Sequence, residues 1–449
     1  MAQFNADGYF DIRLNQDKTQ AFVDIFPPQG GGRNVTTSDI TTALEKKKIA
    51  YGIRHDAIGD ATAKVAANAA PVMAVLAAQG IMPENGTDSQ IVWRIDMEMA
   101  SKPLPKRADG LLNYFELDTA RFVKAGQELA IVVPGLPGKA GKTLIAPFEV
   151  IKQAPGRDVP VMVGDGVKLT SDRLRYVAEV DGVVTFHNEK LKVHAMSWIE
   201  GDLIGGEHTF QSVVVLGRMD GATVNARGFI AVRGLVKQSN LRAHSHILVC
   251  SSENTQMISD SDIYVDSMMK DSVAITPANV FGAPGSIIAG GQVAAAKGIV
   301  AHDLGSTDWP KTEISLEGKT YNQARAHEIE CEMRTAQENI TRIGVALKPL
   351  ASVTAEPMSD AKRKMVQTLM DQKRELEQRG RDLHGEKRSL QMMSYPETGK
   401  IQVAGTVHPG VQVNVYGVHS TIEEGMSEIT YSKASSGKEL TKTPYRKAA

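Results

Sequence analysis

The sequence predicts a mainly β protein with an α/β N-terminal domain, a right-handed parallel β-helix and an antiparallel coiled-coil hairpin inserted into that β-helix. Three patterns support this fold class. Apolar residues recur every 15 to 17 positions after Met196, leucines recur every seven positions from Leu369 to Leu390, and alternating apolar residues open the chain. A period near 17 residues is shorter than a strand-helix-strand unit and suits one coil of a parallel β-helix.

Length and composition limit the class of protein before any element is assigned. The chain has 449 residues, which is enough for about three domains and for a core without disulfide bonds. Its 51 basic and 52 acidic side chains give a net charge of −1, so no overall field favours binding to nucleic acid. There are two cysteines, no secretion signal and no long uncharged apolar run, so we expect a cytoplasmic protein without an integral membrane segment.

Residues 1–88 are predicted to form the α/β N-terminal domain. Residues 9–14 and 20–26 alternate apolar with polar side chains, which predicts a β-hairpin that ends at Pro27. Residues 89–190 are predicted to follow as a β-rich linking module, because short apolar runs alternate there with Gly and Pro.

Two helical segments are predicted to complete the N-terminal domain. Thr37 or Ser38 is expected to cap a helix through Lys48, with Asp39 near the positive end of the helix dipole. A second helical segment is predicted at about 57–78, because alanine dominates that stretch. Helices beside a hairpin make an α/β domain the simplest interpretation.

The parallel β-helix is predicted over residues 191–318. Side chains two positions apart on a strand point to the same face, so repeated apolar pairs predict a continuous interior ladder. Each fully buried aliphatic side chain contributes about 1.5–3 kcal/mol, and it is buried only when the coils stack. The predicted core columns are Val213, Ile230, Ile247 and Ile263; Val215, Val232, Val249 and Val265; and Val224, Leu241, Ile258 and Val273.

Residues 319–394 are predicted to form the antiparallel helical hairpin. One apolar seam steps by four and three residues after Ile329, and the second carries a leucine every seven residues. A parallel dimeric zipper is less favoured, because Gly380 and two lysines occupy its other seam positions. Residues 395–432 are predicted to return as strands to the end of the β-helix, and residues 433–449 form a polar basic tail.

A Gly-Lys-Thr sequence at residues 141–143 raises the possibility of a phosphate-binding loop. The spacing does not fit, because Leu136 stands where such a loop requires glycine. Pro137 also lacks the backbone N–H that would contact a phosphate. A structural turn is therefore favoured over ATP binding, and we predict no cofactor.

A metal site is the next candidate. His244 and His246 share a strand face, and Cys250 follows closely in the sequence. Two histidines without a partnered third ligand are more often exposed side chains than metal ligands. No metal is therefore predicted.

Acidic residues between coils suggest a carbohydrate-active enzyme, because paired acids on the flank of a β-helix can cleave polysaccharides. The candidates are Asp260, Asp262, Asp266 and Asp271. Turns favour aspartate for reasons unrelated to catalysis, so the enzyme remains an alternative rather than the main prediction. No catalytic residue is predicted.

Four segments stand in a particular order along nearly the whole chain. They are Pro27-Pro28 with Gly30-Gly31-Gly32, the spacing Gly80-x-x-Pro83-x-x-Gly86-x-Asp88, the run Pro134-Gly135-Leu136-Pro137-Gly138-Lys139-Ala140-Gly141, and Val407-His408-Pro409-Gly410-Val411. In this order they resemble the flagellar assembly protein A family. The resemblance implies an N-terminal domain, a β-helical body similar to that of the septum-site inhibitor of cell division, and a helical hairpin.

The same resemblance implies a non-enzymatic cytoplasmic protein of flagellar biogenesis. It supplies no catalytic residue, and it assigns the motif residues to turns that connect domains. These residues are Gly80, Pro83, Gly86, Asp88, Pro134, Gly135, Pro137, Gly138 and Gly141.

Three hypotheses about function follow from the sequence. The first is a scaffold or adaptor that binds protein partners, flagellar or regulatory factors, on a stiff β-helix and on the N-terminal domain. The second is a self-polymerising scaffold in which coil ends stack between copies, which would make a homo-oligomer. The third is the carbohydrate-active enzyme.

Overall fold

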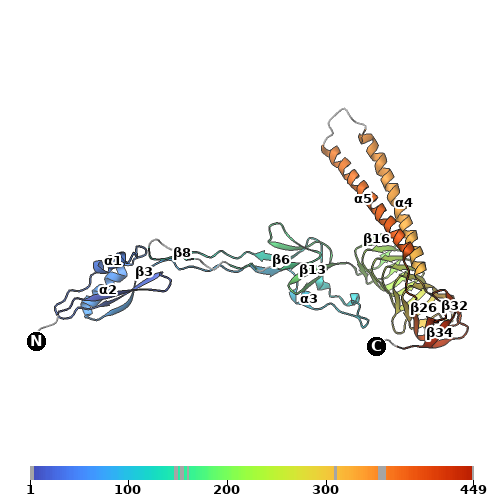
Figure 1. Cartoon of the computed structure of the whole chain (residues 1–449), viewed down its shortest axis with the longest axis horizontal. Helices are drawn as coiled ribbons and strands as arrows, with labels where there is room; N and C mark the ends of the chain where they lie inside the picture. The colour runs from blue at the N-terminus through green and yellow to red at the C-terminus, as the bar shows by residue number, and fades with distance from the viewer. Residues whose placement is uncertain are drawn as a thin grey trace. The chain divides into compact units, whose positions relative to one another are not determined.

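The computed structural model describes residues 5–145, 150–151, 156–158, 161–307, 311–351 and 360–446. The chain divides into two compact units, each of which is described separately (Figure 1). The N-terminal unit comprises Met1–Ser101, Val123–Val180 and Val184–Val193. The solenoid unit comprises Lys102–Phe122, Asp181–Val183 and His194–Ala449. The predicted fold class is confirmed, because an α/β region, a parallel β-solenoid and a helical hairpin are all present.

An antiparallel sheet in the order β1-β2-β3 and two helices form the first part of the N-terminal unit. The elements are β1 (Tyr9–Leu14), β2 (Gln20–Phe26), α1 (Thr37–Lys46), α2 (His55–Asn68) and β3 (Val72–Gln79). Strands β1 and β2 form the predicted hairpin, with Tyr9 opposite Phe26 and Leu14 opposite Ala21. Helix α2 packs on β2 and β3, and apolar side chains from both helices and the sheet make one buried core.

The cap of helix α1 differs from the prediction, which placed it at Thr37 or Ser38. The capping residue is Thr36, whose hydroxyl accepts a hydrogen bond from the Asp39 backbone N–H. The Asp39 carboxylate accepts one from the Thr36 N–H in return. This reciprocal pair satisfies two backbone donors, which a cap one residue later would not do.

The alanine-rich stretch at 57–78 is only partly helical. Helix α2 ends at Asn68, and strand β3 begins at Val72. Alanine favours helix, but β3 forms backbone hydrogen bonds with β2 and buries Ala77 and Ala78 in the core. Tertiary pairing therefore outweighs local propensity here.

Short strands in two four-stranded sheets, together with the two-stranded sheet β7-β8, form the second part of the N-terminal unit. The sheet orders are β10-β11-β6-β4 and β5-β12-β13-β9. The elements are β4 (Gln90–Trp93), α3 (Met97–Ser101), β5 (Phe122–Val123), β6 (Glu128–Val133), β7 (Gly141–Lys142), β8 (Val150–Ile151), β9 (Met162–Val163), β10 (Val167–Leu169), β11 (Arg175–Ala178), β12 (Gly182–His187) and β13 (Lys190–Ala195). Leu129, Leu191 and their apolar neighbours form the core between the sheets.

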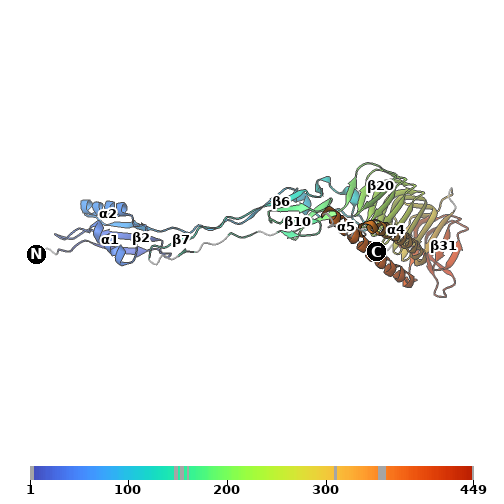
Figure 2. The same cartoon turned by 90° about the horizontal axis from the view of Figure 1, so that it is seen from above.

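The solenoid consists of about seven coils whose strands pair in parallel with the strands of the next coil (Figure 2). Each coil contributes a strand to each of three faces. The first face runs through β14 (Ser197–Ile199), β17 (Val213–Val215), β20 (Ile230–Lys237), β22 (Ile247–Glu253), β24 (Ile263–Thr276), β25 (Asn279–Gly282) and β27 (Gly298–Ala301). The second runs through β15 (Leu203–Ile204), β18 (Met219–Asp220), the later parts of β20, β22 and β24, β26 (Ile287–Ala295) and β28 (Asp303–Leu304). The third runs through β16 (Glu207–Phe210), β19 (Thr223–Ala226), β21 (Asn240–Ala243), β23 (Gln256–Ser259), the ends of β24 and β26, and β29 (Thr312–Leu316).

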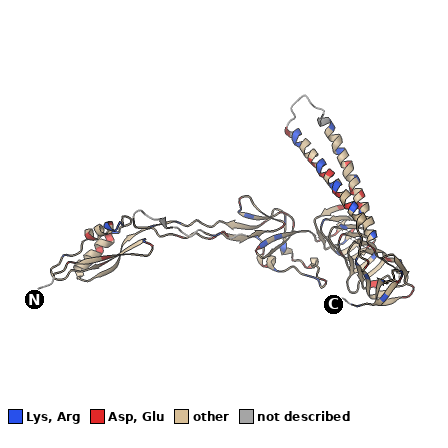
Figure 3. Ribbon diagram, viewed as in Figure 1, with Lys and Arg blue, Asp and Glu red and all other residues tan. Residues whose placement is uncertain are grey.

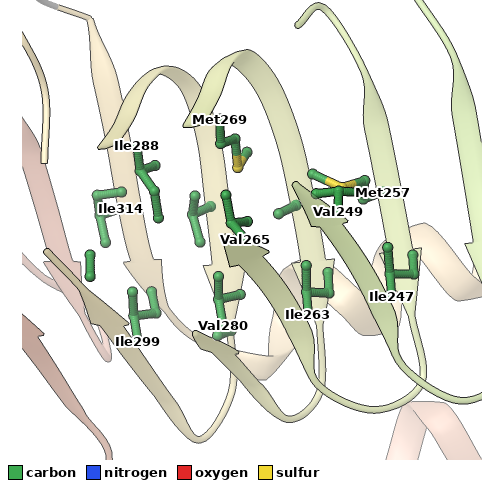
Figure 4. Close-up of a cluster of buried hydrophobic side chains, with 14 of the residues drawn as sticks. Ile247, Val249, Met257, Ile263, Val265, Met269, Val280, Ile288, Ile299 and Ile314 are labelled. Atoms are coloured by element: carbon green, nitrogen blue, oxygen red, sulfur yellow. The ribbon is translucent and has the colours of Figure 1, made fainter. Parts of the chain in front are cut away.

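Branched aliphatic side chains fill the interior of the solenoid (Figure 4). Two of the three predicted columns lie there in the predicted register. Val213 pairs with Ile230, then Ile247 and Ile263, and Val215 pairs with Val232, then Val249 and Val265. All eight side chains are fully buried, so the ladder continues from coil to coil.

The third predicted column is correct only for Val224 and Leu241. Strand β21 pairs with β23 so that Leu241 lies opposite Met257, and the next coil continues with Ala274. The coil from Leu241 to Met257 is one residue shorter than the 17-residue step, and a shift by one residue reverses every side chain. Ile258 and Val273 consequently lie outside the interior, in the cluster beneath the helical hairpin.

The helical hairpin is inserted between the last regular coil and the strands that close the solenoid. It consists of α4 (Gly318–Ala351) and α5 (Asp360–Met392). The closing strands are β30 (Lys400–Val407), β31 (Gln412–Val415), β32 (Val418–Thr421), β33 (Met426–Lys433) and β34 (Leu440–Pro444). Strands β30 and β31 pair in parallel with the last coils, whereas β32, β33 and β34 add antiparallel. This change of direction covers the end of the apolar ladder, where Tyr431 is fully buried.

Candidate functional site

The outer surface of the third face bears a polar network that connects the solenoid to helix α4. Arg242 on β21 forms ion pairs with Asp260, at 2.6 Å, and with Glu328 of α4, at 2.9 Å. Asp260 also accepts a hydrogen bond from the Tyr321 hydroxyl, at 2.6 Å, and contacts His244 Nδ1 at 2.7 Å. Burial disfavours the charged form of Asp260, but these hydrogen bonds and the Arg242 charge outweigh burial and lower its pKa.

A second charged cluster joins the two helices at the base of the hairpin. Arg325 of α4 is only 4% exposed and contacts three carboxylates. Its distances are 2.9 Å to Glu328, 3.0 Å to Glu332 and 2.7 Å to Glu386 on α5. Basic and acidic side chains alternate along both helices, so the ion pairs are local rather than a field of one sign (Figure 3).

Apolar contacts accompany these ion pairs. Ile329 of α4 and Leu383 of α5 are fully buried, and Tyr321 and Leu390 are nearly so. They pack against outward side chains of the third face, including Ile275. Both predicted helical seams are therefore buried near the solenoid. The hairpin is attached to the solenoid by a mixed apolar and ionic contact.

The first face is covered by a different part of the chain, residues 102–122, which we call the strap. Tyr114 of the strap stacks on Phe229, with ring centroids 4.1 Å apart, and its hydroxyl lies 2.8 Å from His246 Nε2. Phe122 packs on Trp198 of the first coil, with ring centroids 4.6 Å apart. Burial raises the pKa of Tyr114 and lowers that of His246, so both groups are uncharged at neutral pH.

A charged contact holds the other end of the strap. Arg107 reaches Asp266 on β24 through two hydrogen bonds of 2.6 and 2.7 Å. It also contacts Asp109 of the strap at 3.1 Å. The backbone turns back on itself here, because Arg107 N–H donates to the Leu111 carbonyl and Gly110 has a φ of 85°. A bidentate arginine fixes the orientation of the strap as well as its position.

The four aspartates proposed for an enzyme do not converge on one site. Asp260 lies in the network with Arg242, and Asp266 is paired with Arg107. Asp262 accepts two hydrogen bonds from Asn279, and Asp271 adopts a left-handed backbone conformation at a corner between faces. Each of the first three carboxylates is therefore engaged in a contact that supports the fold.

The histidines considered for a metal site have separate partners. His244 contacts Asp260, whereas His246 lies against the rings of both Phe229 and Tyr114, which themselves stack on each other. Cys250 is partly buried on β22. In the part of the chain that the structure describes, no group of three or more His, Cys, Asp and Glu residues is placed to hold a metal.

The Gly-Lys-Thr sequence does not open a helix, as a phosphate-binding loop would. Gly141 and Lys142 form strand β7, which pairs with β8. The Lys142 ammonium lies 4.4 Å from the centre of the Tyr51 ring, in a cation-π contact. The segment is part of a paired backbone ladder.

The motif residues assigned to turns lie in that ladder instead. Residues 81–89 pair with residues 136–142, through bridges between Ile81 and Lys142 and between Glu84 and Lys139. A Cβ at Gly80, Gly86, Gly135 or Gly141 would collide with backbone atoms of the facing segment. None of these four glycines has a positive φ. Close backbone approach, rather than a turn, therefore explains glycine at these positions.

The other motif residues belong to the same two segments. Asp88 accepts a hydrogen bond from the Arg157 N–H at 2.7 Å. Pro83 occupies the space that a Cβ atom on Gly141 would take, and Gly138 lies opposite Gly86. Pro134 and Pro137 lie in the extended stretch that follows β6. The motif is thus a structural signature of the N-terminal unit.

Comparison with family models decides the relationship of the chain to known proteins. Residues 10–189 match the model described as the flagellar assembly protein A N-terminal region. Residues 209–439 match the model described as the flagellar assembly protein A beta solenoid domain. The chain belongs to the flagellar assembly protein A family. Comparison with curated proteins and comparison with solved structures both gave no match.

The flagellar assembly protein A family descriptions name an assembly role and a β-solenoid, and neither names a reaction. Among the described residues, no helix is long and apolar enough to cross a membrane.

Sequence reasoning missed the strap, which it placed within a linking module at 89–190. The signal that could have found the covered face is a series of outward aromatic rings. Phe229, His246, Tyr264 and Phe281 recur at steps of 17 or 18 residues on one side of the solenoid. Aromatic side chains at outward positions indicate that another segment covers them.

Proposed function

We propose that this flagellar assembly protein A family member is a non-enzymatic scaffold or adaptor that binds partner proteins during flagellar assembly or its regulation. Membership of the family supports the role in flagellar assembly. The scaffold role rests on one observation. The outer faces of the solenoid hold the strap and the hairpin through combined apolar and ionic contacts, which is how a platform also binds separate proteins.

The partners we propose are flagellar or regulatory proteins in the cytoplasm, with no role for nucleic acid. Balanced charge supports the last point, because 51 basic and 52 acidic side chains provide no general attraction for phosphate backbones. Rigidity supports the choice of the solenoid, because a ladder of stacked coils orders its surface before a partner arrives. The N-terminal unit provides a second candidate surface for docking.

The self-polymerising scaffold is less favoured by one feature of the solenoid. Stacking between copies requires an open coil end, and antiparallel strands β32, β33 and β34 close one end. Sedimentation at increasing protein concentration separates the two hypotheses. A polymer grows with concentration, whereas a scaffold with a closed end keeps a constant size.

The carbohydrate-active enzyme is disfavoured by the dispersion of its candidate acids. A glycosidase needs two carboxyl groups on either side of one bond. Asp260 and Asp266 lie on different faces, beneath the hairpin and beneath the strap. Asp260→Ala is therefore expected to loosen the hairpin rather than to remove turnover of a sugar polymer.

The experiment that tests the proposed function is deletion of the encoding gene with flagella counted by electron microscopy. We expect the number or placement of flagella to change, and expression of the full chain to restore it. A mutant with wild-type flagella would remove the proposed role in assembly. Cell fractionation and a pull-down with the full chain test the cytoplasmic location and the protein partners.

A further inference from the structure

The apolar column on the first face is longer than the strap that covers it. The outward positions of successive coils are Trp198, Val214, Ala231, Leu248, Tyr264, Phe281 and Val300. The strap buries Val214, Ala231 and Leu248. Tyr264 and Phe281 stack on one another, with ring centroids 5.3 Å apart, and remain partly exposed at the edge of the strap.

A cleft of about 520 Å³ opens at this edge. Tyr264 and Phe281 contribute its aromatic side, and Arg107, Asp109 and Asp266 contribute its charged side. Pro284 adds a further apolar side chain. The cleft lies entirely within the solenoid unit.

The strap indicates which chemistry this face binds. The strap forms a tight turn at Arg107–Leu111 and a 3-10 turn at Tyr114–Glu116. It packs an aromatic ring, Tyr114, into the apolar cluster that contains Val214, Ala231 and Leu248, and it places the Arg107 guanidinium on a carboxylate. The cleft continues the same surface by one or two coils. A segment of similar chemistry would meet the same kind of partners there, namely stacked rings and carboxylates.

The charges around the cleft determine which charge a bound side chain should carry. Two carboxylates, Asp109 and Asp266, share the single guanidinium of Arg107. Asp109 is 36% exposed, and its two oxygens each accept one hydrogen bond, from Arg107 and from the Leu111 N–H, which leaves each oxygen a second lone pair for a further donor. A positive side chain would therefore complete the charge balance, whereas a negative one would be repelled.

We propose that this cleft binds a short segment of a partner protein in which an aromatic side chain stands next to Lys or Arg. This inference rests on the proposed scaffold function, because it names one docking surface for that function. The aromatic ring adds to the stack on Phe281, and the basic side chain reaches Asp109. The cleft thereby extends to a separate protein the interaction that the strap makes within the chain.

Fluorescence anisotropy with the full chain and the labelled peptide Ser-Pro-Tyr-Arg-Pro-Ser tests the inference. We expect saturable binding, at least tenfold weaker when Ala replaces the Tyr of the peptide and weaker again when Glu replaces its Arg. Phe281→Ala should reduce the affinity about tenfold, as loss of an aromatic partner does. Asp109→Asn should reduce it several-fold, mainly at low salt.

The matched control is Ile204→Ala, which removes another exposed apolar side chain from the solenoid, one that is 64% exposed. Circular dichroism verifies that each variant is folded. Failure of the peptide to bind below 1 mM, or equal binding to the Phe281→Ala and Ile204→Ala variants, would overturn the inference. Self-association that Phe281→Ala abolishes would also overturn it, because the occupant would then be a second copy.

Failure of this inference is distinguishable from failure of the proposed function. If the cleft does not bind the peptide but gene deletion still alters flagella, the scaffold function stands and its docking surface lies elsewhere. If gene deletion leaves flagella unchanged, the proposed function fails whatever the peptide does. Expression of the Phe281→Ala variant in the deletion strain tests both proposals together. If partners dock in the cleft, this variant should restore flagella only in part.

Discussion

Replacement of Arg325 by alanine is expected to loosen the base of the helical hairpin. Arg325 is 4% exposed and contacts Glu328, Glu332 and Glu386. Removing one partner of a buried ion pair costs about 3–5 kcal/mol, because the remaining charges stay in a poorly solvated place. Glu328 and Glu332 keep Arg242 and Arg379 as alternative partners, which reduces the loss.

The expected cost is therefore about 2–3 kcal/mol, below the usual range for a buried pair. Two of the three carboxylates, Glu332 and Glu386, are 38% and 40% exposed, so water also compensates them in part. A local loss of this size raises the rate of amide hydrogen exchange about 30- to 150-fold wherever exchange requires the hairpin to open. Arg379→Ala is the matched control, because Arg379 is 51% exposed and its contact contributes about 0–1 kcal/mol.

Hydrogen exchange measured by mass spectrometry on the full chain provides the assay. It measures the opening of α4 and α5 separately from that of the solenoid. A single melting curve would not separate them, because the chain contains two units. The reasoning is refuted if exchange in the first turns of α4 rises less than threefold. It is also refuted if Arg379→Ala produces the same increase as Arg325→Ala.

Three further predictions concern the interior, the paired glycines and the strap. Ile247→Ala is expected to destabilise the solenoid by about 2–5 kcal/mol in urea unfolding, against less than about 0.5 kcal/mol for the exposed Ile204→Ala; equal midpoints would contradict the interior ladder. Gly135→Ala should disrupt the paired segments 81–89 and 136–142 of the N-terminal unit and increase their proteolysis, whereas the control Gly59→Ala within α2 should stabilise that unit by about 0.5–1 kcal/mol. Unchanged proteolysis of Gly135→Ala would show that the close backbone approach at Gly135 does not require glycine. Burial lowers the pKa of His246, so the stability of the strap should be complete above the unfolded pKa of about 6.5 and decrease as pH falls below it. Hydrogen exchange of residues 102–122 at pH 7.5 and 5.5, corrected for intrinsic rates, should reveal this dependence, and His246→Phe should abolish it.

The sequence allowed the interior ladder to be predicted because every coil presents the same positions to the interior. Branched residues such as Val215, Val232 and Val249 consequently repeat with the coil length. The prediction failed at Ile258, where one coil is a residue shorter and the apolar side chain belongs to the outer surface. Spacing alone does not distinguish these cases, because the surface beneath the hairpin also carries apolar side chains, such as Ile258 and Ile275.

The covering segments could not be derived from the repeat. The strap ends at Phe122, about 75 residues before the first solenoid strand begins at Ser197, and its contact depends on the pairing of Tyr114 with Phe229 and His246. Arg325 stands between Ala324 and Ala326 on α4, a helix rich in charged residues, so its local sequence resembles that of a solvated helix surface. Only tertiary structure identifies it as buried.

The glycine motif illustrates a further limit. Glycine and proline at regular spacing predicted turns, which are their commonest use. At Gly86 and Gly135 the reason for glycine is the closeness of a facing backbone. The sequence thus revealed a constraint on side-chain size without revealing its geometric cause.

The point at which the hairpin leaves the solenoid also bears on how such proteins diversify. Leu316, which ends β29, lies beside Ala295, while Lys400, which begins β30, lies beside Gly298. Departure and return therefore occur at one corner of the tube, between neighbouring rungs. Whole heptads can therefore be added to or removed from the helical hairpin without altering the winding of the coils. The length of the hairpin can vary independently of the solenoid, in natural variants or by protein engineering.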